Sequence, residues 1–221
     1  FSKDNKYFFF ITDVGKEFSY LVKYKIETGE KEVLFETSWD VMYSYLSENE
    51  RYRVIAINED GKNTLFIKDL ENNSDVYFPK VLDGDIKAVS FSESEEKIRL
   101  TIGTSKSPND IYVYNIGNKE LKKLTETLNP EINSNDLVAA EVVRYPSFDG
   151  FEIPAIYYKP LNVTKKNKVP ALVWVHGGPG GQSRTGYSSL IQYLVNHGYA
   201  ILAVNNRGSS GYGKTFYKMD D

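Results

Sequence analysis

Two short segments in the first half of the chain alternate between apolar and polar residues. In residues 97–102 the apolar positions are Ile98, Leu100 and Ile102, with polar residues between them. In residues 52–57, Val54 and Ala56 alternate with Arg53, Ile55 and Ile57. A period of two is typical of β-strands that bury one face. The pattern therefore predicts a strand in each segment.

These strands belong to a repeat of about 45 residues. An apolar residue followed by serine recurs at 45-residue offsets (46 − 1 and 91 − 46), as Phe1-Ser2, Leu46-Ser47 and Phe91-Ser92. A polar turn and a strand follow each pair, and the first of these strands is predicted at 7–12. A second strand recurs at 20–26, 64–70 and 110–116, and a short edge strand is expected around Leu34, Phe78 and Leu124.

A four-stranded unit of this length is typical of one blade of a β-propeller. Residues 1–135 are thus predicted to form about two and a half to three C-terminal blades, each a four-stranded antiparallel sheet. A closed propeller typically needs about 4–8 blades, so we expect earlier blades before residue 1. An ordinary antiparallel sandwich with accidental internal similarity is the alternative.

A polar linker at 129–136 ends the blade pattern. Two strands are predicted after it, at 140–145 and 153–159. The pair Asp149-Gly150 lies between them and favours a tight hairpin. The second half of the chain therefore begins with an antiparallel pair of strands.

The residues after this hairpin have the pattern of a βαβ unit. Residues 171–175 and 199–204 are continuous apolar runs, which are typical of strands buried on both faces. Between them, residues 188–197 place apolar side chains at helical spacing, and Gly198 follows as a C-cap glycine. Because a βαβ unit makes its two strands parallel, residues 136–221 are predicted to begin an α/β domain.

Composition narrows the range of partners. The 221 residues carry a formal net charge of −3 and a sequence pI near 5.6, and none of them is cysteine. Disulfides, thiolate catalysis and cysteine-based zinc sites are therefore excluded. No apolar run reaches the roughly 18 residues that span a bilayer. We predict no cofactor, no metal, no nucleic-acid partner and no membrane partner.

The N-terminus bears on the compartment. Phe1 is not a start methionine, so we expect the chain to be cut at this end. The cytoplasm is favoured, although an original signal peptide could have been lost. The sequence does not decide between a monomer and a homo-oligomer.

The loop at 176–180, His176-Gly177-Gly178-Pro179-Gly180, directly follows a predicted buried strand. In acyl transfer, backbone N–H groups must lie about 3 Å from the oxygen that becomes an oxyanion. Glycine lets the main chain approach a substrate closely, and proline stiffens the turn. A loop of this kind after such a strand forms one arm of the oxyanion hole in α/β-hydrolases. A plain glycine-rich turn is the alternative.

Residues 170–179 and 203–213, with the strand end at 157–160, resemble the prolyl oligopeptidase family and most closely its acylaminoacyl-peptidase-like branch. The resemblance implies an N-terminal β-propeller joined to a C-terminal α/β-hydrolase domain, of which residues 136–221 would be the start. It also implies a serine peptidase that hydrolyses short peptides through an acyl-enzyme. The propeller would limit access to the active site.

By this resemblance, the N–H of Gly178, beside Gly177, would be an oxyanion donor. His176 is expected to orient the loop, because the histidine of a hydrolase triad follows the serine and the acid along the chain. His197, at a predicted helix end, is expected on the surface. The nucleophilic serine, the aspartate and the catalytic histidine are thus absent, so the fragment is predicted to be inactive by itself.

Three further residues are assigned to the loops of the site. Pro179 is expected to stiffen the glycine loop. Arg207 is expected to form a salt bridge that holds the loops, with direct contact to a substrate carboxylate as the sharper alternative. Tyr212 is expected either to line the substrate pocket or to pack.

Two alternatives for the function stay open. A carboxylesterase-like α/β-hydrolase would use the same loop. The segment Gly208–Thr215 also matches the phosphate-binding pattern G-x-x-x-x-G-K-[ST], which makes a P-loop nucleotide-binding protein the less favoured alternative. The nearby Gly208-Ser209-Ser210-Gly211 is not a nucleophile elbow, because G-x-S-x-G requires glycine where Tyr212 stands.

Overall fold

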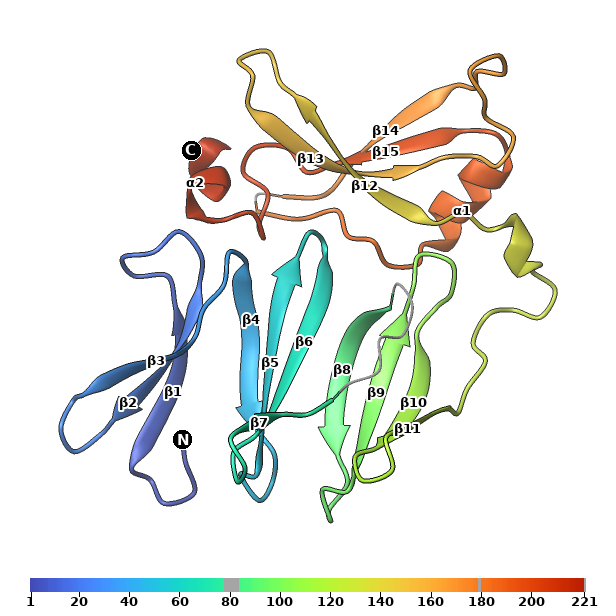
Figure 1. The fold of residues 1–221 in the computed structure, drawn as a ribbon. Coiled ribbons are helices and arrows are strands. Elements are labelled where there is room, and N and C mark those ends of the chain that lie inside the picture. Colours follow the sequence, from blue (N-terminus) through green and yellow to red (C-terminus); the bar gives the residue numbers. More distant parts are fainter. Residues whose placement is uncertain (78–83, 179, 221) are drawn as a thin grey trace.

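The computed structural model describes residues 1–77, 84–178 and 180–220. Three antiparallel sheets stand side by side, and a fourth, mixed sheet lies across one end of them (Figure 1). The predicted four-stranded antiparallel sheets are confirmed for the second and third of the three. The strands of the three sheets are β1 (Tyr7–Thr12), β2 (Tyr20–Lys25) and β3 (Lys31–Phe35); β4 (Asp40–Leu46), β5 (Tyr52–Glu59), β6 (Lys62–Asp69) and β7 (Ser74–Asp75); and β8 (Asp85–Phe91), β9 (Lys97–Gly103), β10 (Asp110–Asn115) and β11 (Glu120–Lys123).

The sequence repeat is also a repeat of hydrogen bonds. The hydroxyl groups of Ser2, Ser47 and Ser92 each accept a hydrogen bond from the first backbone N–H of the strand that follows. Three residues after each serine, the backbone adopts a positive φ of 57–59° at Asn5, Glu50 and Glu95. Because residues other than glycine seldom adopt positive φ, the three turns share one conformation, and the predicted repeat is confirmed.

Neighbouring turns are joined by carboxylates that the sequence did not reveal. Glu50 accepts a hydrogen bond from the N–H of Lys3, and Glu95 accepts one from the N–H of Asn49, each at 2.6 Å. The turn of one sheet thus holds the turn of the sheet before it. The two residues in each contact are about 46 positions apart in the sequence, so no local sequence pattern predicts that they meet.

The second and third sheets share one apolar core. Tyr52 and Val54 of β5 pack there against Ile98 and Leu100 of β9 and Tyr114 of β10. In 97–102 the apolar positions of the alternation are the buried ones, as the pattern predicted. In 52–57 every residue is buried, because Ile55 and Ile57 on the other face pack in a second core. The shared core orients the second and third sheets toward each other.

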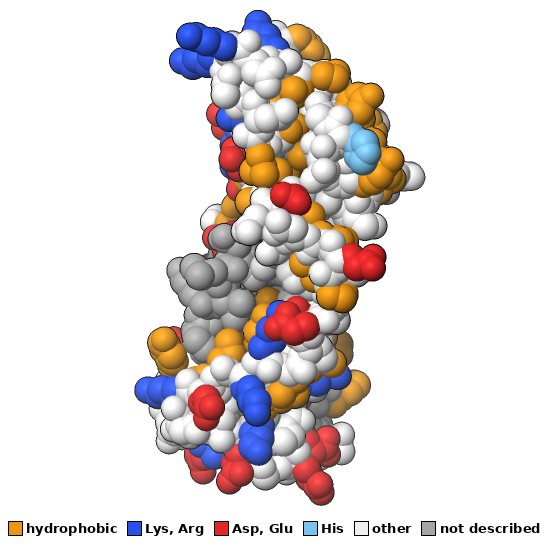
Figure 2. Space-filling model, turned by 90° about the vertical axis from the view of Figure 1, so that its right-hand side faces the viewer, with side chains coloured by type: hydrophobic (Ala, Val, Ile, Leu, Met, Phe, Trp, Pro, Cys, Tyr) orange, Lys and Arg blue, Asp and Glu red, His pale blue; other side chains and the backbone are white. Residues whose placement is uncertain are grey.

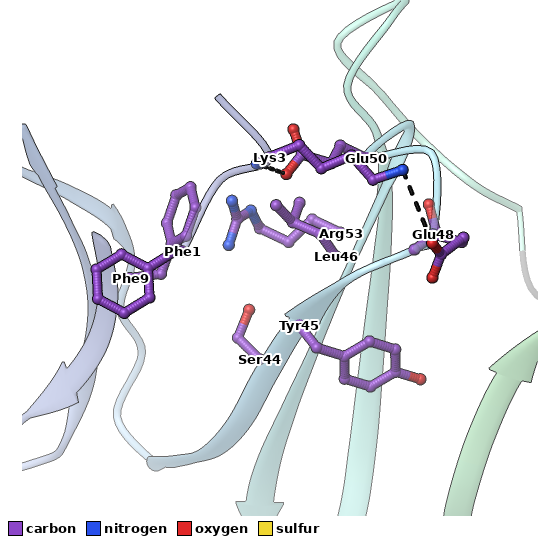
Figure 3. Close-up of a pocket in the computed structure, with 10 residues that line it drawn as sticks. Phe1, Lys3, Phe9, Ser44, Tyr45, Leu46, Glu48, Glu50 and Arg53 are labelled. Carbon is purple, nitrogen blue, oxygen red and sulfur yellow. Dashed lines mark hydrogen bonds and ion pairs between the residues drawn. The ribbon is translucent and has the colours of Figure 1, made fainter. Parts of the chain in front are cut away.

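Arg53 interrupts the corresponding core between the first and second sheets. Its equivalent one repeat later, Ile98, is fully buried, whereas Arg53 is 6% exposed and bounds a cavity that Phe1 and Ser44 also line (Figure 3). The guanidinium lies 4.1 Å from the centre of the Phe9 ring, which stabilises the cation through the π-face. Burial lowers the pKa of Arg53 to about 10.

Two of the predicted edge strands differ from expectation. In the second sheet the edge strand is the two-residue β7, Ser74–Asp75, and Phe78 lies outside the described residues. In the third sheet β11 ends at Lys123, one residue before Leu124. Edge strands pair on one side only, so their extent depends on few hydrogen bonds and is the least predictable part of a sheet.

The linker at 129–136 is irregular except for a short 3₁₀ turn, η1 (Ser134–Asp136), and leads into the mixed sheet. The strand order in this sheet is β12-β13-β15-β14, with the first two pairs antiparallel and the last pair parallel. The predicted βαβ unit is therefore present. The elements are β12 (Ala140–Pro146), β13 (Glu152–Tyr158), β14 (Ala171–Val175), α1 (Ser189–Asn196), β15 (Ala200–Val204), α2 (Lys214–Tyr217) and η2 (Lys218–Asp220).

The prediction that residues 171–175 are buried on both faces is wrong. β14 lies at the edge of the mixed sheet, and Val173 and Val175 are 67% and 69% exposed. β15 lies between two strands and is buried, with Ile201 fully inaccessible. Both runs are equally apolar, so composition could not distinguish the edge strand from the inner one.

Helix α1 covers one face of the mixed sheet through Ile191 and Val195. It begins and ends as predicted, with the Ser188 hydroxyl accepting from the Ile191 N–H and with Gly198 at a φ of +87°. Its outer face exposes Leu190 and Tyr193, and hydrophobic side chains gather on this side of the molecule (Figure 2). Among the described residues, every helix is too short to cross a bilayer.

Candidate functional site

The two segments that resemble the family lie side by side. β14 and β15 are parallel neighbours, and their last residues, Val175 and Val204, are register partners. The loops that follow, beginning at His176 and Asn205, therefore leave the sheet at the same edge. In parallel sheets this carboxyl edge is where ligands bind.

His176 joins the two loops through both ring nitrogens. Its Nε2 lies 2.8 Å from the hydroxyl of Ser209, and its Nδ1 lies 3.0 Å from the carbonyl oxygen of Gly177. A carbonyl oxygen can only accept, so Nδ1 carries the proton that it donates to Gly177. The ring thus connects the second loop to the backbone of the first.

The backbone of the glycine loop is open to solvent at its tip. Gly177 and Gly178 are exposed, and a side chain at Gly177 would meet no atom within 4 Å. Neither of their N–H groups donates a hydrogen bond to another described residue. Pro179 lies outside the described residues. Two exposed residues whose N–H groups have no acceptor among the described residues therefore lie at the edge of the sheet.

Asn205 fastens the base of both loops. Its amide is fully buried; the oxygen accepts from the Ser183 N–H at 2.6 Å and the nitrogen donates to the Ser183 carbonyl at 3.1 Å and to the Tyr212 hydroxyl at 2.8 Å. Burial raises the pKa of Tyr212 to about 12. The Tyr212 ring packs against Trp39 and Phe216. Of the two expectations for Tyr212, the structure shows packing.

Arg207 forms the expected salt bridge, with Asp149 in the β12–β13 turn at 2.5 Å. The N–H of Phe151 and the guanidinium together lower the pKa of Asp149. The guanidinium also lies 5.1 Å and 5.5 Å from the ring centres of Phe148 and Phe151. Arg207 therefore holds the hairpin turn beside the site, and its Nε is buried without a partner among the described residues.

Ser209 and His176 have the spacing of a nucleophile and its base, but their environment differs. Ser209 has 0% exposure, and its hydroxyl also donates to the Asn206 carbonyl at 2.6 Å. A nucleophile must reach a substrate carbon, which a fully enclosed hydroxyl cannot do. The contact between Ser209 and His176 was not predicted from the sequence, because the two residues are 33 positions apart and no local pattern pairs them.

The other histidine lies away from the site. His197 is exposed at the end of α1, where its Nδ1 donates to the Tyr193 carbonyl oxygen at 2.8 Å. Its ring packs on the Tyr193 ring at 4.1 Å. The expected surface position is confirmed. Within the described part of the chain, no group of three or more histidine, aspartate or glutamate side chains is placed to hold a metal ion.

The geometry argues against a P-loop at Gly208–Thr215. The carboxylate of Glu17 accepts hydrogen bonds from the Thr215 N–H and hydroxyl, at 2.7 Å and 2.8 Å. Lys214 is paired with Asp13 at 3.2 Å. The groups that would bind a phosphate are thus engaged by carboxylates from the β1–β2 connection. They join the mixed sheet to the first antiparallel sheet.

Comparisons with known proteins find a family and relatives to which this chain is similar. A family model described as "Platelet-activating factor acetylhydrolase, isoform II" matches residues 105–221. "Dipeptidyl peptidase family member 6" of Caenorhabditis elegans is 26% identical over 97% of this chain, and "Dipeptidyl aminopeptidase BIII" of Pseudoxanthomonas mexicana is 24% identical over 96%. The chain spans about a third (32%) of the length of these two relatives.

A solved structure shows a similar fold. The acylaminoacyl peptidase of Pyrococcus horikoshii has a TM-score of 0.70 at 22% identity, over 96% of this chain and 33% of its own. The match extends over the antiparallel sheets as well as the mixed sheet, since so much of this chain is covered. The likeness at this identity concerns the arrangement of the chain.

Proposed function

We propose that this chain, which belongs to the prolyl oligopeptidase family of peptidases, forms the oxyanion-hole arm of a serine-type peptidase. Over residues 105–221 it also belongs to the platelet-activating factor acetylhydrolase isoform II family of α/β-hydrolases. The substrate class we propose is short peptides. Hydrolysis would pass through an acyl-enzyme. Gly178 would donate its N–H to the oxyanion, with Gly177 beside it.

One observation carries this proposal. Gly177 and Gly178 are exposed at the carboxyl edge of a parallel strand pair, and their N–H groups have no acceptor among the described residues, on a loop whose base is held by His176. Donors fixed before reaction stabilise a developing oxyanion more than donors that must reorient. Free N–H groups on a fastened loop meet this requirement.

The nucleophile has to come from elsewhere in the complete protein. No G-x-S-x-G occurs in these 221 residues, and Ser209 is enclosed. The relatives are about three times as long as the matched region. We therefore propose that the serine elbow, the acid and the catalytic histidine are supplied by sequence outside residues 1–221, and that these residues alone do not hydrolyse peptides.

The antiparallel sheets would serve as propeller blades. We propose that residues 1–135 form blades and that residues 136–221 begin the catalytic domain. The repeated turns support this division, because each antiparallel sheet is joined to the next in the same way. Blades placed across the carboxyl edge of the mixed sheet would restrict substrates to short peptides.

An esterase is the second candidate. The family model that matches residues 105–221 is described as an acetylhydrolase, which favours small acyl esters over peptides. The oxyanion loop would serve either reaction, since both pass through a tetrahedral intermediate. A peptidase and an esterase differ in the leaving group of the substrate, and the oxyanion loop does not distinguish between them.

The test uses the full-length protein. We expect a fluorophosphonate probe to label one serine in a G-x-S-x-G, and we expect hydrolysis of dipeptide or acyl-amino-acid nitroanilides. A p-nitrophenyl ester with the same acyl group serves as the comparison. A clear preference for the ester would favour the esterase, and the absence of both labelling and hydrolysis would reject a serine hydrolase.

A further inference from the structure

The geometry points to Ser209 as a positioning residue for the oxyanion loop, acting through His176. This inference rests on the proposed function, because it concerns how the N–H donors of Gly177 and Gly178 are held. The hydroxyl of Ser209 fixes the imidazole, and the imidazole fixes the Gly177 carbonyl. The substrate would touch neither side chain.

The His176 ring connects Ser209 to the loop through its two nitrogens. Nδ1 donates to the Gly177 carbonyl at 3.0 Å. Nε2 lies 2.8 Å from the hydroxyl oxygen of Ser209. The amide that follows the Gly177 carbonyl carries the Gly178 N–H, so fixing the carbonyl also fixes the direction of that donor.

Ser209 is itself immobilised by its own turn. Its N–H donates to the Asn206 carbonyl at 3.0 Å, and its hydroxyl lies 2.6 Å from the same oxygen. Gly208, just before it, adopts a φ of +89°, which only glycine tolerates readily. The side chain has no exposure at all. Ser209 is therefore a fixed point from which the glycine loop can be held.

The loop has few other attachments near its tip. A Cβ added at Gly177 would meet no atom within 4 Å, and one added at Gly178 would meet only the Gly180 nitrogen, at 3.6 Å. The His176 ring is thus the side chain that links this backbone to the second loop. Without the Ser209 hydroxyl, the ring loses its fixed orientation, and the N–H donors lose their fixed direction.

The test compares two buried serines in the full-length protein. We expect Ser209→Ala to lower kcat by about 10–100-fold with KM changed less than about threefold, because a displaced donor weakens the transition state more than the bound substrate. Ser47→Ala is the matched control. Ser47 is also buried, and its hydroxyl also forms a hydrogen bond with the backbone, accepting from the Tyr52 N–H, but it lies in a sheet turn. The control should lower the melting temperature and leave kcat unchanged.

A double-mutant cycle separates positioning from general loosening. His176→Phe keeps a ring and removes its hydrogen bonds, so it should lower kcat about as much as Ser209→Ala, and the double variant should be no worse than either. Additive losses would overturn the inference, as would an unchanged kcat in Ser209→Ala.

A crystal structure of the Ser209→Ala variant tests the positioning role of Ser209 separately from the proposed function. In Ser209→Ala we expect residues 176–178 to shift or become disordered, and an unmoved loop would overturn the inference. If the wild-type protein neither reacts with fluorophosphonate nor hydrolyses any substrate, the proposed function fails, while the crystal structure still decides whether Ser209 positions the loop.

Discussion

Replacing Gly181 with alanine is expected to lower kcat/KM of the full-length protein by about 100-fold or more. A Cβ at this position would lie 2.7 Å from Nδ1 of His176 and closer still to the Gly177 carbonyl oxygen. Both atoms belong to the hydrogen bond that orients the oxyanion loop. Since one of them is backbone, the loop must move to admit the methyl group. Hydrolysis rates measured on the purified variant give the result.

Gly186→Ala is the control for this prediction. Gly186 lies in the same connection between β14 and α1, and a Cβ there would meet only the flexible end of Lys87 at 3.7 Å. This variant should keep kcat/KM within about twofold of the wild type, as expected for a substitution that meets no rigid neighbour. If Gly181→Ala were as active as Gly186→Ala, the loop would not need its observed conformation, and the site would have to be sought elsewhere.

The sheets could be predicted from the sequence because their signals are local and repeated. Alternation in 97–102 marks buried positions directly, and the serine turns recur at Ser2, Ser47 and Ser92. The features that the sequence did not predict depend on which residues or strands lie next to each other in space. The exposure of β14 follows from its place at the sheet edge. Arg53 is buried at a position where the next repeat has an apolar residue, and the sequence of its own strand does not predict this burial.

The site was predictable in part for the same reason. The glycine loop and the 203–213 segment were found separately, and the parallel pairing of β14 and β15 brings them together. The contact between His176 and Ser209 could not be found, because hydrogen bonds across 33 residues depend on side-chain direction. The P-loop pattern, the less favoured alternative, matches in sequence without the environment of a phosphate site, because its lysine and threonine are bound to Asp13 and Glu17.

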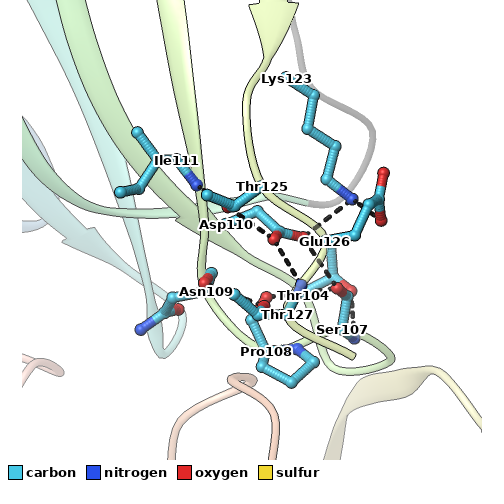
Figure 4. Close-up of polar contacts among 10 residues, drawn as sticks. All are labelled: Thr104, Ser107, Pro108, Asn109, Asp110, Ile111, Lys123, Thr125, Glu126 and Thr127. Carbon is cyan, nitrogen blue, oxygen red and sulfur yellow. Dashed lines mark hydrogen bonds and ion pairs between the residues drawn. The ribbon is translucent and has the colours of Figure 1, made fainter. Parts of the chain in front are cut away.

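Asp110 is the centre of a polar network that ends the third sheet (Figure 4). Its side chain is 2% exposed and forms an ion pair with Lys123 at 2.9 Å. One carboxylate oxygen also accepts from the Thr125 hydroxyl and the Thr127 N–H, each at 2.9 Å. The network fastens β10 to the strand end from which the chain leaves for the mixed sheet.

Removing the Asp110 carboxylate is expected to destabilise this chain by about 2–4 kcal/mol, because Asp110→Ala removes a buried acceptor that pairs with Lys123 and accepts hydrogen bonds from Thr125 and Thr127. Asp110→Asn should be milder, since an amide oxygen can still accept from Thr125 and Thr127. Urea unfolding at neutral pH measures both. Glu126→Gln is the control: Glu126 also pairs with Lys123, but it is 81% exposed, so its loss should change stability by less than about 0.5 kcal/mol. Equal effects at Glu126 and Asp110 would show that burial does not strengthen the network.

The pH dependence of this network has a definite sign. Burial alone would raise the pKa of Asp110, but hydrogen bonds from Lys123, Thr125 and Thr127 outweigh it and lower the pKa below the ordinary value of an aspartate. A carboxyl group with a lowered folded-state pKa stabilises the fold above its unfolded-state pKa, and this contribution disappears as the pH falls through the folded-state value. Wild-type stability should therefore fall below about pH 4, and Asp110→Asn should fall less over the same range, because its side chain does not titrate there. Parallel curves for the two proteins in acid would contradict the assignment, since another carboxyl group would then account for the loss.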